Sequence, residues 1–178
     1  MSKSFQINAG DTALLVIDVQ QALFTRSTPI YNGSQLILTI NSLVNRSHLR
    51  GIPVVYIQHS NQTLLKDGTP GWQIHPDLNP LETDLLIHKT QGNAFIDTTL
   101  QRELKSQEVK NLLITGLVTH QCIQATCLGG LELGYRVFLI EGGHSNFHKD
   151  AAKVIEKWQL ELEKAGVLLA SPNGIAFF

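Results

Sequence analysis

Residues 111–127 read NLLITGLVTHQCIQATC, and this stretch indicates how the chain is built. An apolar run of strand length ends at Gly116, a polar Thr-His-Gln run follows, and a helix is predicted to start near residue 120. Cys122 would then face the positive end of the helix dipole, which lowers the pKa of a thiol. Cys122 also fits a packing role, because cysteine is among the most buried residue types.

Further apolar runs on both sides of this stretch have the length of strands. They are continuously hydrophobic rather than alternating, as expected when both faces of a parallel sheet are covered. They alternate with helical patterns, of which the first has Ser34 as its expected N-cap and the last stops at Gly166. The sequence therefore predicts an α/β fold, a three-layer α/β/α sandwich around a parallel sheet of about five or six strands. Strands are expected at 13–18, 53–58, 84–89, 111–116, 135–140 and 166–170, and helices at 34–50, 98–107 and 149–166.

Length and composition predict a single domain over residues 1–178. The 178 residues are 43% hydrophobic and 16% charged, and the formal net charge is −1. This balance lacks the signature of disorder and gives no electrostatic footprint for nucleic acid or an anionic membrane. The first residues lack the apolar core of a signal peptide, and two cysteines without an export signal favour a reducing cytoplasm. We expect a cytoplasmic protein that binds a small-molecule substrate.

Chemically active side chains lie at the ends of several expected strands. Asp18 ends the first, Lys89 ends the third and Cys122 follows the fourth. Ligands of open α/β sheets bind beyond the carboxyl ends of the strands, so these groups are expected at one edge. A thiol can attack a carbonyl, a carboxylate can take its proton, and an ammonium can stabilise both anions. Taken alone, Asp18 also fits the role of a turn residue, and Lys89 that of a solvated residue at a strand end. The expected position of all three side chains at one edge favours a catalytic group.

The sequence carries no cofactor pattern. No HxH, HExxH or paired Cys/His spacing occurs, and neither GxGxxG nor GxxxxGK[ST] is present. We therefore expect neither a metal nor a nucleotide cofactor.

Three segments in this order resemble the isochorismatase-like cysteine hydrolase superfamily. They are ALLVIDVQQALF (13–24), HKTQGNAF (88–95) and GLVTHQCIQATCLGGLELGYRVFLIEGGHS (116–145). The resemblance implies a six-stranded parallel sheet in the order 3-2-1-4-5-6 and a catalytic triad. The triad roles would fall on Asp18, Lys89 and Cys122. It further implies a cis peptide between Leu117 and Val118, which would aim the Val118 and Cys122 N–H groups as an oxyanion hole.

The chain departs from some members of this superfamily. Nicotinamidases carry an Asp-x-His pair after the second strand as part of a metal site, and this chain has His59-Ser60-Asn61 there. A metal-dependent nicotinamidase is therefore disfavoured. Isochorismatases that cleave a vinyl ether lack the nucleophilic cysteine, so Cys122 disfavours that activity.

A connection over residues 59–80 follows the second strand without a helical pattern, and such long loops are usually functional or mobile. We expect it to cover the pocket. Family members use aromatic residues near these segments to hold a flat substrate, and the usual Thr-Asp pair before the cysteine is Thr119-His120 here. The expected substrate-pocket residues are Phe24, His59, Trp72, Thr119 and His120, with His75 and Phe147 as further specificity residues.

Together these features predict a metal-independent cysteine hydrolase that cleaves a small amide-type C–N bond through a thioester. Two alternatives remain open: an isochorismatase-type or other non-amide hydrolase, and a catalytically silent ligand-binding member of the fold. The resemblance also implies a homo-oligomer.

Overall fold

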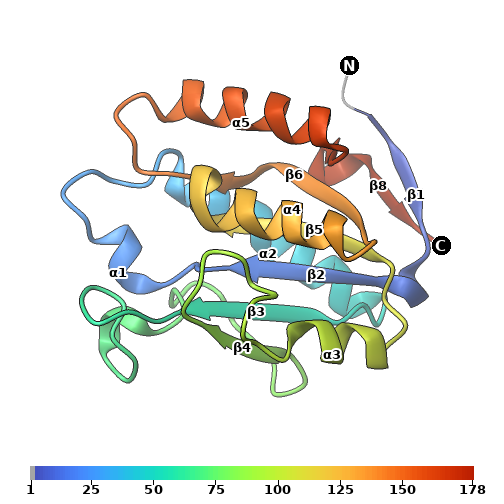
Figure 1. Cartoon of the computed structure of the whole chain (residues 1–178), viewed down its shortest axis with the longest axis horizontal. Coiled ribbons are helices and arrows are strands. Elements are labelled where there is room, and N and C mark those ends of the chain that lie inside the picture. The colour runs from blue at the N-terminus through green and yellow to red at the C-terminus, as the bar shows by residue number, and fades with distance from the viewer. Residues whose placement is uncertain (1–2) are drawn as a thin grey trace.

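Six parallel strands form the central sheet of this computed structural model, which describes residues 3–178. Helix α2 lies on one face of this sheet and α3, α4 and α5 on the other (Figure 1). The main-sheet strands lie in the order β4-β3-β2-β5-β6-β7. Numbered among themselves, they have the predicted order 3-2-1-4-5-6. The elements are β1 (Phe5–Ile7), β2 (Thr12–Ile17), α1 (Gln21–Phe24), α2 (Gly33–Leu49), β3 (Val54–His59), β4 (Leu85–Lys89), α3 (Leu100–Ser106), β5 (Asn111–Leu117), α4 (Gln124–Glu132), β6 (Arg136–Ser145), α5 (Ala151–Ala165), β7 (Leu168–Ala170) and β8 (Ile175–Phe177).

The two faces of the sheet bury separate apolar cores. Along β2, Leu14 and Val16 pack in the cluster that includes α2, whereas Leu15 and Ile17 pack in the cluster of α3, α4 and α5. Every residue of β2 is buried. This explains the unbroken apolar runs of the sequence, since strands covered on both faces need apolar side chains at successive positions.

The sequence-based boundaries need two corrections. Helix α2 begins at Gly33 and is preceded by Asn32 in the left-handed conformation, so Ser34 lies inside the helix and is not its N-cap. Strand β6 continues to Ser145 because a register shift opposite Ile114 and Gly116 carries its pairing past the expected end.

Strands β1 and β8 form a second, two-stranded parallel sheet that was not predicted. Each is three residues long, too short to give a periodic signal. Within residues 3–178, no helix is both long and apolar enough to cross a membrane.

Candidate active site

The candidate active site lies where the parallel strands of the main sheet end. Strand register sets Ile17 beside Ile57 and His59 beside Lys89. Asp18 directly follows Ile17, so its carboxylate reaches the same edge. Cys122 arrives from a turn of π-helix, Thr119–Ile123, between β5 and α4. Parallel pairing thus brings together residues more than one hundred positions apart in the chain.

Lys89 is the centre of this group. Its Nζ donates to Asp18 Oδ2 at 2.9 Å and to Cys122 Sγ at 3.2 Å. It also lies 3.2 Å from His59 Nδ1 and 3.2 Å from the Gln91 carbonyl oxygen. Only 2% of Lys89 is exposed, and a buried ammonium is stable only with charged or polar partners. Lys89 is therefore no solvated strand end; it forms a buried ion pair with Asp18.

Asp18 has one carboxylate oxygen that remains available. Its Oδ2 pairs with Lys89, whereas Oδ1 is buried and meets no hydrogen-bond donor in the described part of the chain. The backbone φ of Asp18 is 54°, in the left-handed region that costs energy for a non-glycine residue. The Asp18 N–H, bonded to the Ile57 carbonyl at 2.8 Å, holds this conformation. A buried carboxylate oxygen without a partner can take a proton from the thiol.

The thiol of Cys122 does not have the lowered pKa that the helix dipole predicts. Burial and the negative charge of Asp18 raise the pKa of Cys122 to about 12, and Lys89 opposes them only in part. The expectation failed because the cysteine lies in a π-helical turn beside a buried carboxylate, at a depth that the sequence does not show. The resting thiol is therefore protonated, and its proton must leave as the sulfur attacks.

The peptide bond between Leu117 and Val118 is cis, at the position that the resemblance implies. Leu117 is fully buried in β5, and Val118 lines the cavity that also contains Cys122. The oxyanion-hole role of the Val118 and Cys122 N–H groups remains a prediction.

A cavity of about 370 Å³ opens onto Asp18 and Cys122. Its apolar walls come from the α1 region, from the loop after β3 and from the loop after β6. Of the predicted pocket residues it contains His59, and of the further specificity residues Phe147. Its lining residues are Asp18, Leu23, Arg26, His59, Asn61, Thr63, Leu64, Leu65, Gly92, Val118, Gln121, Cys122 and Phe147.

Four predicted pocket residues lie elsewhere. Trp72 is buried and fixes the loop, since its Nε1 donates to Ser60 Oγ at 2.9 Å. Thr119 is fully buried and contacts His144 beneath the π-helical turn. His120 does not line the cavity, and burial and His148 lower its pKa. The sequence places Thr119 and His120 near the cysteine, but only the packing decides which side of the turn they face.

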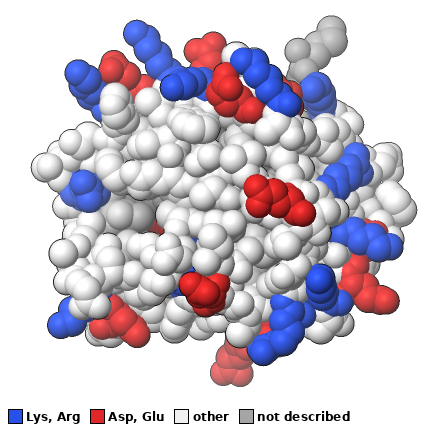
Figure 2. Space-filling view, in the orientation of Figure 1, with Lys and Arg blue, Asp and Glu red and all other residues white. Residues whose placement is uncertain are grey.

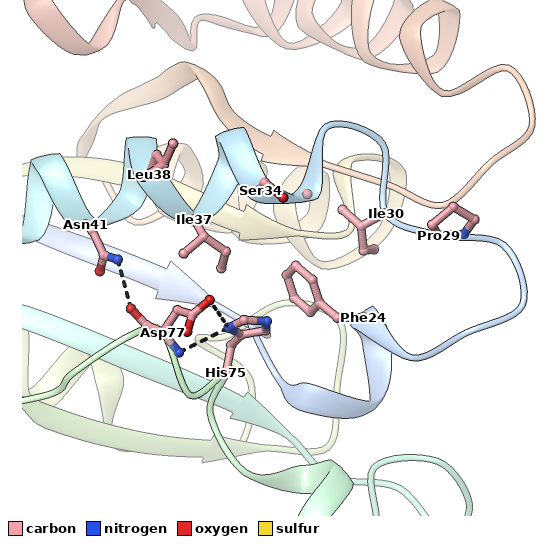
Figure 3. A pocket seen from close by; sticks show the side chains of 10 residues that line it. Phe24, Pro29, Ile30, Ser34, Ile37, Leu38, Asn41, His75 and Asp77 are labelled. Atoms are coloured by element: carbon pink, nitrogen blue, oxygen red, sulfur yellow. Dashed lines mark hydrogen bonds and ion pairs between the residues drawn. The ribbon is translucent and has the colours of Figure 1, made fainter.

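Phe24 lines a separate cavity of about 540 Å³ between α1 and α2 (Figure 3). Its ring meets His75 edge-on, with ring centroids 4.4 Å apart. His75 therefore lies in this second cavity as well, and neither residue lines the cavity at Cys122. Leu23, the neighbour of Phe24 in α1, lines the cavity at Cys122 instead.

Two residues with a role at the site were not predicted. The Gln20 side chain accepts from the His59 N–H at 2.9 Å and donates to the His59 and Trp72 carbonyl oxygens, so it anchors the loop after β3. The sequence signal that could have identified Gln20 is its position two residues after Asp18. Arg26 enters the cavity from the loop after α1, and no local pattern distinguishes it from a solvated arginine.

The groups around Lys89 include the donor types of a metal site. Ligand atoms of Asp18, His59 and Cys122 lie within 4.8 Å of one another. The Lys89 ammonium is already within 3.2 Å of all three residues. A cation bound there would meet a buried like charge, which is costly.

The segment where nicotinamidases carry their Asp-x-His pair is also unsuited to a metal. Asn61 Oδ1 accepts from the N–H groups of Thr63 and Leu65, both at 2.9 Å, and Ser60 Oγ accepts from Trp72. These oxygens stabilise the loop itself, so the residues present do not fit that metal site.

Comparison with known proteins identifies the family of this chain. The isochorismatase domain matches residues 12–168. A streptothricin hydrolase of Streptomyces noursei is 31% identical over 142 residues, 79% of this chain and 51% of the relative. The ureidoacrylate amidohydrolase RutB of Pseudomonas savastanoi pv. phaseolicola is 23% identical over 73% of this chain and 69% of its own length. A solved isochorismatase family protein superposes with a TM-score of 0.85 at 27% identity, over 90% of this chain and 98% of its own. The chain thus spans about half the length of the streptothricin hydrolase.

Proposed function

This chain belongs to the isochorismatase family, and on that premise we propose that it is a metal-independent cysteine hydrolase that cleaves a small amide-type C–N bond. One observation carries the proposal: Lys89 Nζ bridges Asp18 Oδ2 and Cys122 Sγ at 2.9 and 3.2 Å at the edge of a cavity. A base, a nucleophile and a charge-stabilising group in mutual contact have the roles that covalent catalysis requires.

In the first half of the reaction, Cys122 attacks the amide carbonyl carbon while its proton passes to Asp18 Oδ1. Concerted transfer is required because the raised thiol pKa leaves almost no free thiolate at neutral pH. The carbonyl oxygen becomes an oxyanion, for which the Val118 and Cys122 N–H groups are the proposed donors. Asp18 then gives its proton to the leaving nitrogen, the C–N bond breaks, and ammonia or an amine departs from the thioester.

In the second half, Asp18 takes a proton from water and the hydroxide attacks the thioester carbonyl. The C–S bond breaks, the carboxylic acid product forms and the proton returns to the sulfur. Lys89 Nζ donates to Asp18 Oδ2 at 2.9 Å and so balances the charge of the carboxylate between the steps. The net reaction consumes one water for each C–N bond cleaved.

The names of the relatives support a hydrolase. One is an amidohydrolase and the other a streptothricin hydrolase. The alternatives are a non-amide hydrolase, including vinyl-ether cleavage, and a silent binding protein. Neither of them needs a thiol, a carboxylate and an ammonium in contact.

The test is acid-quenched mass spectrometry of the wild type and of Cys122→Ala during turnover of a panel of small amides. We expect an acyl adduct on Cys122 and a loss of at least about a thousandfold in kcat for Cys122→Ala. Cys127→Ala is the matched control, since Cys127 is fully buried in the core and should keep activity. Full activity in Cys122→Ala would rule out covalent catalysis, and turnover of vinyl ethers alone would favour the first alternative.

A further inference from the structure

We propose that the substrate carries a carboxylate and that Arg26 binds it, an inference that rests on the proposed hydrolase and narrows its substrate class. Arg26 lines the same cavity as Asp18 and Cys122, although it belongs to the exposed loop between α1 and α2. An arginine at the mouth of a reaction cavity, away from the reacting atoms, is suited to recognise one end of a substrate.

Arg26 is held in place but keeps its hydrogen-bonding capacity. Its guanidinium lies 4.2 Å from the centroid of the Phe147 ring, a cation–π contact between the loop after α1 and the loop after β6. Among residues 3–178, no carboxylate pairs with Arg26 and no hydrogen bond uses its side chain as donor. A planar guanidinium stacked on a ring leaves its N–H edge free, and that edge matches a carboxylate in a bidentate pair.

The charges within the cavity favour an anionic ligand. Asp18 and Lys89 neutralise each other in their ion pair. The Cys122 thiol is protonated, and burial together with Lys89 lowers the pKa of His59, so His59 is uncharged at neutral pH. Every other lining residue except Arg26 is uncharged, so the cavity has one unbalanced positive charge.

The walls of the cavity indicate the shape of the substrate. The lining combines the apolar side chains of Leu23, Leu64, Leu65 and Phe147 with Arg26, and it also includes the polar groups of Asp18 and Cys122. Figure 2 shows a hollow at the end of the molecule toward which the sheet strands point, with an isolated basic side chain near its rim. A short carbon chain with an amide at one end and a carboxylate at the other suits this arrangement.

The first test needs no substrate. Cys122 is alkylated at pH 9 with neutral iodoacetamide and with anionic iodoacetate, and each rate is measured by peptide mass spectrometry. We expect Arg26→Gln to lower the iodoacetate rate about tenfold while the iodoacetamide rate changes little, because one charge-assisted pair is lost. Arg26→Lys should retain part of the iodoacetate rate. Arg102→Gln, at an exposed arginine of α3, is the control and should match the wild type.

The second test compares succinamate with its neutral isostere succinamide as substrates. We expect the wild type to favour succinamate, and Arg26→Gln to raise KM for succinamate about tenfold with a smaller change in kcat. Turnover of succinamide alone, or equal effects of Arg26→Gln on both alkylating agents, would overturn the carboxylate site and leave the hydrolase standing. No turnover and no acyl adduct, together with the iodoacetate effect, would overturn the hydrolase and support the carboxylate site.

Discussion

At the scale of single residues, the sulfur of Cys122 is a protonated thiol rather than a thiolate. Burial and Asp18 together raise the pKa of Cys122 to about 12. Lys89 contacts both groups, so the pair Asp18–Lys89 is charged while the sulfur is neutral. In the proposed mechanism, this thiol becomes a nucleophile only when Asp18 Oδ1 takes its proton.

This distribution of charge predicts the pH dependence of Cys122 alkylation. The rate with iodoacetamide should still rise with pH at pH 9, because the thiol titrates far above neutrality. Asp18→Asn removes a cause that raises the thiol pKa, so it should speed alkylation at pH 8 about tenfold for each unit by which the pKa falls. Hydrolysis should fall in the same variant. Peptide mass spectrometry measures both cysteines at once, with buried Cys127 as the unlabelled reference; a wild-type plateau below pH 8 would contradict this prediction.

At the scale of elements, the approach of β5 to β2 determines where Asp18 lies. Gly116 pairs with Ile17 and has a φ of 117°. A Cβ added at Gly116 would lie only 2.0 Å from the Ile17 carbonyl oxygen. Only glycine permits this close approach, and Ile17 is the residue before Asp18. The glycine at the end of β5 therefore fixes the position of the Asp18 carboxylate through the neighbouring strand.

We expect Gly116→Ala to lower the free energy of unfolding by about 3 kcal/mol or more, since backbone atoms must move to accept the methyl group. The matched control is Gly134→Ala, which also has a positive φ of 86° but no atom within 4 Å of the added Cβ. That control should cost only the backbone strain, about 1 kcal/mol. Urea denaturation of both variants measures the difference; equal losses would show that the contact with Ile17 is unimportant.

At the scale of the whole molecule, a buried histidine links the site to the outer helix α5. Thr119 donates its hydroxyl proton to the Ser145 carbonyl oxygen at 3.0 Å, so His144 Nδ1, at 2.9 Å, must donate to Thr119. His144 Nε2 then accepts from Gln159 of α5 at 3.2 Å. Burial lowers the pKa of His144 to about 4, so the imidazole stays neutral in the folded protein.

Folding stability should therefore fall in mild acid. The unfolded chain takes up a proton at His144 near pH 6.5 while the folded protein does not, so the loss runs from about pH 6.5 down to about pH 4. It should reach about 3 kcal/mol for this one group. Urea denaturation of the wild type and of His144→Gln at several pH values measures it. An unchanged slope in His144→Gln would assign the acid sensitivity to other groups.

The homo-oligomer and the cytoplasmic location remain predictions.

The sequence by itself determined the layers and the edge at which the reactive residues meet. Unbroken apolar runs require a sheet covered on both faces, and residues that end parallel strands must share one edge. Asp18 and Lys89 could be placed together for that reason, before any contact was known. The order of the strands came from the resemblance of three segments, and the sheet of the structure has that order.

Only the tertiary structure decided what surrounds those residues. The Cys122 pKa depends on its depth and on Asp18, and the lining of the cavity depends on which way loop side chains turn. Arg26 and Phe147 meet from loops about 120 positions apart, whereas Phe24 and Trp72 turn away from the cavity. The ends of strands can be predicted from the local hydrophobic pattern of the sequence. The burial of a residue and the direction of a loop side chain arise from long-range packing, which no local pattern encodes.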